Sequence, residues 1–177
     1  MLWVYAPGYC NGAHLSDSLI SDVVRMHVEE IKNDRPVMIQ IDSSIIPDLQ
    51  LSVWETPLDP AFYVDDHGAE SLGCYVHTDR TAFAVKHFND FTSWYIAMPF
   101  DDVRLMQYIF QKAGVHFYNK SGNDIFYAGN GLLVIHTKIG GQQTIFLKNG
   151  RMVNINLSPL STTILDSETG KILFSNF

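Results

Sequence analysis

Four acidic side chains are the candidates for acid–base chemistry in this sequence: Glu55, Asp65, Asp66 and Glu70. Hydrolysis of a glycosidic bond needs two carboxyl groups, about 5 Å apart in retaining enzymes and about 6.5–9.5 Å apart in inverting ones. Asp65 and Asp66 are followed by His67 and a glycine, between two predicted strands. Such a run is typical of a turn, because Asp side chains bond to nearby backbone groups. We therefore predict a structural turn here and no catalytic residue.

Two cysteines offer a second chemistry, that of a thiol activated by an imidazole. Cys10 precedes an Asn-Gly pair and a predicted helix, where a nucleophilic thiol can sit on a sharp strand-to-helix turn. The residues around Cys10 lack the small side chains that such a turn requires. Cys74 falls in the middle of a predicted strand. Both are predicted to be small core residues rather than a redox or catalytic pair.

Seven histidines are scattered along the chain, and none forms an HxH or HxxxH pair. A metal site needs ligands that converge, and His67 and His77 could approach one another only through the fold. His136 alternates with Leu132 and Val134, so it shares their face of a strand and is predicted to be a core histidine. The sequence therefore predicts no metal site and no cofactor.

Trp54 is the strongest candidate for a binding residue. It alternates with Ser52 and Thr56, on the more polar face of its predicted strand. An exposed indole can stack on the apolar face of a sugar ring or anchor a protein interface. The candidate ligand or interface residues are aromatic or imidazole side chains: Trp54, Tyr9, Tyr63, Tyr118 and His67.

The composition is that of a globular protein with an acidic surface. Of the 177 residues, 46% are hydrophobic and 18% are charged, and the formal net charge is -7. A negative surface repels phosphate backbones, and the chain has no Lys/Arg cluster, so nucleic acid is not expected as a partner. No apolar run approaches the roughly 20 residues of a membrane-spanning helix. No signal peptide follows Met1, so a membrane partner is not expected and a cytoplasmic location is the default.

The first part of the chain mixes strands with one helix. Residues 2–6 are apolar on both faces, which predicts a strand buried on both sides, as in a parallel sheet. Because such a strand needs neighbours, we expect a portion of the protein to precede it. Residues 15–32 repeat apolar side chains every four positions and predict a helix, capped by Ser16 or Asp17. Short strands are then predicted at 37–41, 51–55, 61–64, 72–76, 82–85 and 91–98, with a hairpin turn at 89–90.

A second helix is predicted from an N-cap at Asp101. Phe100 and Leu105 stand at the positions of a hydrophobic staple, and Gly114 supplies the left-handed residue after the helix. Beyond Gly114 the pattern predicts an antiparallel meander with strands at 125–128, 132–139, 144–147, 152–155, 162–165 and 172–174. The predicted fold class is an α/β portion, a partial flavodoxin- or amidotransferase-like sheet with about two helices, followed by a small antiparallel β domain. The whole chain is expected to be β-rich.

Several stretches of sequence carry a resemblance to a known family. They are Tyr5–Tyr9, Phe91–Tyr95, Ala113–Tyr118, Leu132–Thr137, Gly140-Gly141 and Ile145–Leu147. Together they resemble the C-terminal region of large bacterial β-galactosidase-like glycoside hydrolases. In that family a catalytic (β/α)8 barrel is followed by a domain like the class I glutamine amidotransferases, and then by a small β domain.

The resemblance implies that residues 1–115 correspond to the back half of the amidotransferase-like domain and residues 116–177 to the terminal β domain. The barrel, with its two catalytic carboxylates, is absent, so no catalytic residue of the family can be carried onto this sequence. The expected function is a non-catalytic accessory module that supplies packing or oligomerisation surface. Its expected partners are a second copy of the chain or the missing domains of the parent protein.

Two other functions stay open at this point. A carbohydrate-binding module would present an exposed aromatic platform around Trp54, with carbohydrate as its partner. A small independent hydrolase would need a pocket in which carboxylates, or a thiol and an imidazole, converge.

Overall fold

The computed structural model describes residues 1–52, 55, 57–76 and 78–176. The chain divides into two compact units, Met1–Met106 and Gln107–Phe177. A boundary between folding domains at residue 115, as expected from the sequence, stays a prediction. No helix in the described ranges has both the length and the apolar character that a membrane crossing demands.

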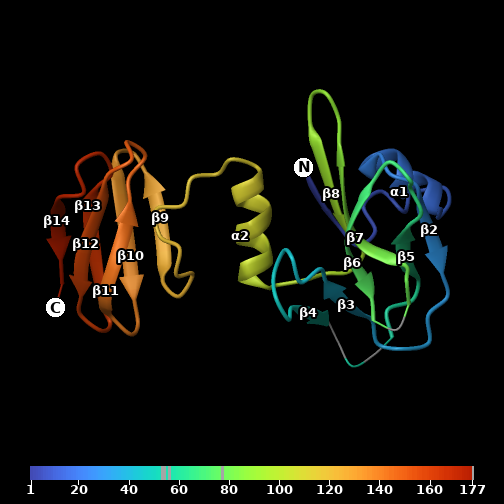
Figure 1. The fold of residues 1–177 in the computed structure, drawn as a ribbon, viewed down its shortest axis with the longest axis horizontal. Helices are drawn as coiled ribbons and strands as arrows, with labels where there is room; N and C mark the ends of the chain where they lie inside the picture. The colour runs from blue at the N-terminus through green and yellow to red at the C-terminus, as the bar shows by residue number, and fades with distance from the viewer. Residues whose placement is uncertain (53–54, 56, 77, 177) are drawn as a thin grey trace. The chain divides into compact units, whose positions relative to one another are not determined.

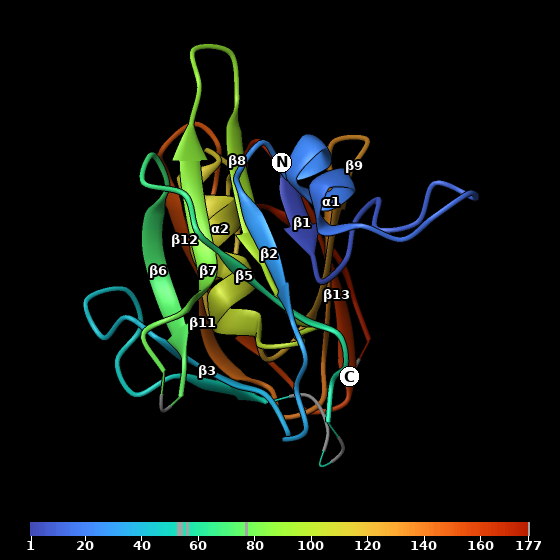
Figure 2. The ribbon, with the colours of Figure 1, turned by 90° about the vertical axis from the view of Figure 1, so that its right-hand side faces the viewer.

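The first unit is built on one curled, mixed sheet (Figures 1 and 2). Its main path runs through β1 (Leu2–Val4), β8 (Thr92–Ile96), β7 (Thr81–His87), β6 (Glu70–Tyr75), β3 (Met38–Ile41) and β4 (Gln50–Ser52). Strand β5 (Ala61–Val64) joins β7 and carries β2 (Val28–Ile31) on its other side. The largest side chains without solvent exposure include Ile39, Phe62, Phe83, Tyr95 and Ile96.

Strand β1 lies at one end of the sheet path and runs parallel to β8, as a parallel-sheet strand was expected to do. The prediction that it is buried on both sides is wrong. Leu2 and Trp3 are half-buried, and Val4 is 40% exposed. Strands β7 and β8 form the predicted hairpin, closed by the bond from the Phe88 N–H to the Phe91 carbonyl at 2.8 Å.

Helix α1 (Asp17–Val24) begins directly after the predicted cap Ser16, two residues later than the predicted start at 15, and ends eight residues early. Ser16 is the N-cap, and its hydroxyl accepts from the Ser18 N–H at 3.2 Å. Arg25 then adopts the left-handed conformation, with φ of 62°, and ends the helix. The prediction of a helix up to residue 32 is wrong, because residues 28–31 instead pair with β5 and bury Val28. A tertiary strand pairing here overrides the local four-residue period.

Helix α2 (Val103–Lys112) has a cap at each end. Its N-cap is Asp102, one residue after the predicted Asp101, since the Asp102 carboxylate accepts from the backbone N–H of Arg104 at 2.8 Å and of Leu105 at 3.1 Å. The predicted left-handed Gly114 is confirmed, with φ of 77°. The N–H of the residue after Gly114 bonds back to Phe110 at 2.9 Å, which completes a Schellman motif.

Replacing Asp102 with Ala is expected to lower the free energy of unfolding by about 1 kcal/mol, because two backbone N–H groups of the first turn lose their acceptor. Urea denaturation followed by circular dichroism measures the change. The Asp101→Ala variant is the matched control and should stay within about 0.5 kcal/mol of the wild type. A larger loss from Asp101→Ala than from Asp102→Ala would contradict this assignment of the cap.

The second unit is an antiparallel β-sandwich. A four-stranded sheet has the order β14 (Ile172–Ser175), β13 (Ser161–Asp166), β10 (Leu132–Thr137) and β9 (Ile125–Gly129). A hairpin of β11 (Gly141–Phe146) and β12 (Met152–Leu157) forms the second sheet. The predicted antiparallel strands are confirmed, but a simple meander is wrong, because β10 pairs with β13 and not with β11.

The core of the second unit lies between its two sheets. Its buried members come from β10, β13, the hairpin and the turn after β11: Leu133, Ile135, Leu165, Ile145, Leu147, Ile155 and Leu157. Tyr118, Phe126 and Val153 pack against this cluster. Because side chains alternate along a strand, the neighbours of the core residues on β10 and β13 point to the opposite face of the four-stranded sheet.

Candidate functional site

Strands β2 and β5 bring together the polar side chains with most potential for chemistry in the first unit. Glu29 lies directly opposite Tyr63 in the register, and the Tyr63 hydroxyl donates to the Glu29 carboxylate. His27 lies opposite Asp65, whose N–H bonds to the His27 carbonyl at 3.0 Å. The imidazole Nε2 of His27 is 3.5 Å from the Glu29 carboxylate, and the Arg80 guanidinium lies 4.4 Å from the Tyr63 ring centre.

This cluster has the donor set of a cation site, but its Glu29 carboxylate is already bonded to Tyr63 and lies beside His27. His27, Glu29 and Asp65 each offer one ligand atom, and these atoms lie within 4.8 Å of one another. The hydrogen bond to Glu29, followed by partial burial, raises the pKa of Tyr63, while the positive charge of Arg80 opposes the shift. Cross-strand pairing of polar side chains is sufficient to account for the arrangement, so we assign no metal to it.

Asp66 has a structural role. Its carboxylate accepts from Lys86 Nζ at 2.7 Å, from the His27 N–H at 3.0 Å and from the Gly68 N–H at 2.8 Å. Burial opposes ionisation of Asp66 and is the largest single influence, but these hydrogen bonds and the charge of Lys86 outweigh it and lower the pKa. The bond from the Ala69 N–H to the Asp66 carbonyl at 3.0 Å closes the predicted turn.

The cysteines and His136 differ from their predicted environments. Cys10 is exposed and not a core residue, and its sulfur accepts from the Gly12 N–H at 3.4 Å. Cys74 is half-buried, with its sulfur 3.6 Å from the Ser71 hydroxyl. The prediction that His136 is a core residue is wrong. It is exposed, because the other face of β10 forms the core, and its Nδ1 lies 2.9 Å from the Thr162 hydroxyl.

The predicted ligand candidates do not converge in the described part of the chain. Tyr9 donates to the Glu30 carboxylate at 2.5 Å and packs edge-on against Phe62, with ring centres 5.1 Å apart. The hydrogen bond to Glu30 is the main cause that raises the pKa of Tyr9 to about 12. Tyr63 belongs to the β2–β5 cluster, and His67 is exposed in its turn. Trp54 and His77 lie outside the described residues.

Sequence reasoning missed an exposed apolar row on the outer face of the four-stranded sheet. The row consists of one side chain from each strand, in register across the sheet: Tyr127, Val134, Ile164 and Phe174. Tyr127 is 66% exposed and Phe174 is 52% exposed, while Val134 and Ile164 between them are half-buried. The sequence did contain a sign of this row, because some of its strands are apolar on both faces. In residues 133–135, for example, a core residue stands on either side of Val134.

The comparisons with known proteins show which fold this chain shares. No protein-family model and no curated protein matches the sequence. The β-galactosidase from Bacillus circulans sp. alkalophilus matches with a TM-score of 0.55 and 14% identity, over 82% of this chain and 25% of that one. Gan42B, a GH42 β-galactosidase from G. stearothermophilus, matches with a TM-score of 0.55 and 13% identity, over 94% of this chain and 26% of that one.

The cold-adapted β-galactosidase from Rahnella sp. R3 also matches, with a TM-score of 0.55 and 11% identity over 88% of this chain. The chain shares its fold with part of a β-galactosidase. It spans about a quarter of the length of these enzymes, 25% or 26% in each case. At such identities the likeness is one of fold alone.

Proposed function

We propose that this chain is a non-catalytic accessory module of a β-galactosidase-like glycoside hydrolase. In this proposal residues 1–115 correspond to the amidotransferase-like portion and residues 116–177 to the terminal β domain. The module supplies an association surface, and the observation that carries the proposal is the apolar row Tyr127, Val134, Ile164 and Phe174. The likeness of fold to β-galactosidases supports the assignment of the parent class.

The environments of the acidic side chains support a non-catalytic role. A catalytic pair needs one carboxyl group that is free to hold a proton and a second that is free to attack or to activate water. The Asp66 carboxylate is instead held ionised by Lys86 and two backbone N–H groups. The Glu29 carboxylate accepts a hydrogen bond from the Tyr63 hydroxyl. Glu55 and Glu70 are exposed on the surface.

The apolar row has the properties of a protein interface. Aromatic side chains contribute much of the binding energy of typical interfaces, and contiguous exposed apolar patches mark interaction sites. Ile125 and Leu132 extend the patch on the same face, with 55% and 38% exposure. Burial of this surface would remove apolar area from water, which is the main driving force of association.

A second copy of the chain is the occupant that this geometry favours. The row carries an aromatic side chain at each end and a β-branched aliphatic side chain at each inner position. A two-fold axis parallel to the strands, between β10 and β13, would place Tyr127 over the Phe174 of a second copy. The same axis would place Val134 over the Ile164 of the second copy, so the row is complementary to itself, as an isologous interface requires.

Sedimentation equilibrium of the full chain over a range of concentrations tests this proposal. The wild type is expected to form a concentration-dependent dimer. The double substitution Tyr127→Lys with Phe174→Lys should weaken dimerisation by at least about tenfold, because two aromatic anchors are lost and like charges meet. A variant with Thr at both positions keeps the strand propensity and should weaken dimerisation without adding charge.

The matched control places two lysines on apolar side chains that are at least as exposed but lie off the row, Met152 at 68% and Leu160 at 73% exposure. This Met152→Lys, Leu160→Lys variant should dimerise like the wild type. A wild-type chain that stays monomeric at every concentration, or a control that loses the dimer as fully as the Tyr127/Phe174 variant, would overturn the proposal.

A further inference from the structure

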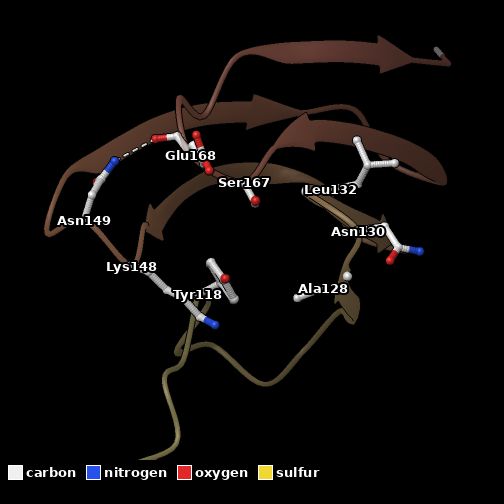
Figure 3. Close-up of a pocket in the computed structure, with 10 residues that line it drawn as sticks. Tyr118, Ala128, Asn130, Leu132, Lys148, Asn149, Ser167 and Glu168 are labelled. Atoms are coloured by element: carbon white, nitrogen blue, oxygen red, sulfur yellow. Dashed lines mark hydrogen bonds between the residues drawn. The ribbon is translucent and has the colours of Figure 1, made fainter.

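Three turns at one end of the sandwich surround a half-open pocket of about 630 Å³ (Figure 3). They are the β9–β10 turn, the β11–β12 turn and the β13–β14 turn. The polar side chains that line the pocket come from all three turns and from the segment before β9: Tyr118, Asn130, Lys148, Asn149, Ser167 and Glu168. A volume of this size lies within the range of small-molecule sites, about 300–1,000 Å³.

The three turns are tied to one another, so the pocket is formed without a ligand. The Asn149 side-chain amide donates to the Glu168 carbonyl at 2.7 Å, the contact drawn as a dashed line in Figure 3. The Ser167 N–H donates to the Gly131 carbonyl at 2.8 Å. The Tyr118 ring is fixed by stacking on Phe126, with ring centres 5.9 Å apart. A site that is already ordered loses little conformational entropy when it binds.

The polar groups of the pocket are free to bind. The side chains of Asn130, Lys148, Ser167 and Glu168 make no hydrogen bond or ion pair with any part of the chain that the structure describes. They combine a hydroxyl, an amide, one positive charge and one negative charge. Asn149, by contrast, is used to hold the turns together, since its side-chain oxygen also accepts from the Arg151 N–H at 3.0 Å.

This combination selects a class of ligand. A phosphate or another anion would be repelled by Glu168, and a cation would be repelled by Lys148. An apolar molecule would leave both charges unsatisfied. A neutral ligand with several hydroxyl groups can donate to Glu168 and accept from Lys148 at the same time, while its C–H surface contacts the Tyr118 ring. We propose that this pocket is a saccharide-binding site, which accepts one or two neutral sugar units.

The proposal does not rest on the association surface, because none of the four residues of the apolar row lines the pocket. Leu132, at the edge of the extended patch, is the one residue that the two surfaces share. Titration of the ¹⁵N-labelled full chain with lactose and with cellobiose, followed by ¹H–¹⁵N correlation spectra, tests it directly. At least one sugar should cause saturable shifts that are confined to the amides of residues 128–132, 148–150 and 167–169. The double variant Lys148→Ala, Glu168→Ala should bind that sugar at least tenfold more weakly.

The control variant is Lys138→Ala, which removes an exposed lysine of the same unit outside the pocket. It should bind like the wild type. The single variant Glu168→Gln keeps the size of the side chain and should weaken binding without any change in the spectrum of the free protein beyond the turn. Absence of saturable shifts with both sugars, shifts that map elsewhere, or equal binding by the double variant would overturn the proposal.

Discussion

The Asp66→Asn substitution is expected to lower the free energy of unfolding by about 2 kcal/mol at neutral pH. Asn keeps the size of the side chain but loses the charge that pairs with Lys86, and the Lys86 and Asp66 side chains are only 25% and 13% exposed. Removal of one partner leaves a largely desolvated ammonium without its counter-charge. Urea denaturation of the full chain measures the difference.

The effect of Asp66→Asn on the free energy of unfolding is expected to depend on pH. The pKa of Asp66 is lowered in the folded chain, so its stabilising effect is fully present above the unfolded pKa of an Asp, about 3.9. The effect is lost as the pH falls through the lower folded pKa. The stability difference between the wild type and Asp66→Asn should therefore shrink below about pH 4.

The neighbouring Asp65→Asn variant is the matched control for this prediction. Asp65 is exposed, and its carboxylate forms no ion pair with a lysine or arginine in the part of the chain that the structure describes, unlike the Asp66 carboxylate, which pairs with Lys86. Its substitution should change the free energy of unfolding by less than about 0.5 kcal/mol. Equal losses from both substitutions, or a difference for Asp66→Asn that does not depend on pH, would contradict the structural role given to Asp66.

The Leu133→Ala substitution is expected to lower the free energy of unfolding of the second unit by about 3 kcal/mol or more. Leu133 has no solvent exposure and belongs to the core between the two sheets. Its truncation removes buried apolar surface and leaves a cavity. Hydrogen exchange of the amides of β10 and β13 measures the loss within this unit.

The adjacent Leu132→Ala variant tests which face of β10 is the core. Leu132 is 38% exposed on the outer face, so its truncation should lower the free energy of unfolding by less than about 1 kcal/mol. The sequence had suggested the opposite, with His136 and Leu132 directed inward. A greater loss from Leu132→Ala than from Leu133→Ala would restore that earlier interpretation and would remove the apolar row from the surface.

Local patterns in the sequence were sufficient for much of the fold. The strands at 61–64 and in the second unit, the hairpin at 89–90 and the left-handed Gly114 follow from residue preferences that act over a few positions. Such local preferences mispredict the secondary structure where pairing with a distant segment determines it. Residues 28–31 continue a helical period, but the chain places them against β5, 30 to 36 residues further along, after Arg25 ends the helix.

The candidate surfaces depend on pairings that no local pattern specifies. The apolar row exists only because Tyr127, Val134, Ile164 and Phe174 meet in register across four strands. The sequence showed each as an apolar residue in a strand, yet it could not show which strands are neighbours, and β10 pairs with β13 across the intervening hairpin. The pocket likewise arises from three turns that are adjacent only in space, although Tyr118 was already a candidate by residue type.

The central claim is that this chain supplies binding surface and carries out no hydrolysis itself. Incubation of the purified full chain with o-nitrophenyl β-D-galactopyranoside, with release of nitrophenol followed by absorbance, tests it most directly. We predict a rate equal to that of buffer alone, and no change in the Glu29→Gln or Asp65→Asn variants. Hydrolysis by the wild type that one of these substitutions abolishes would contradict the account.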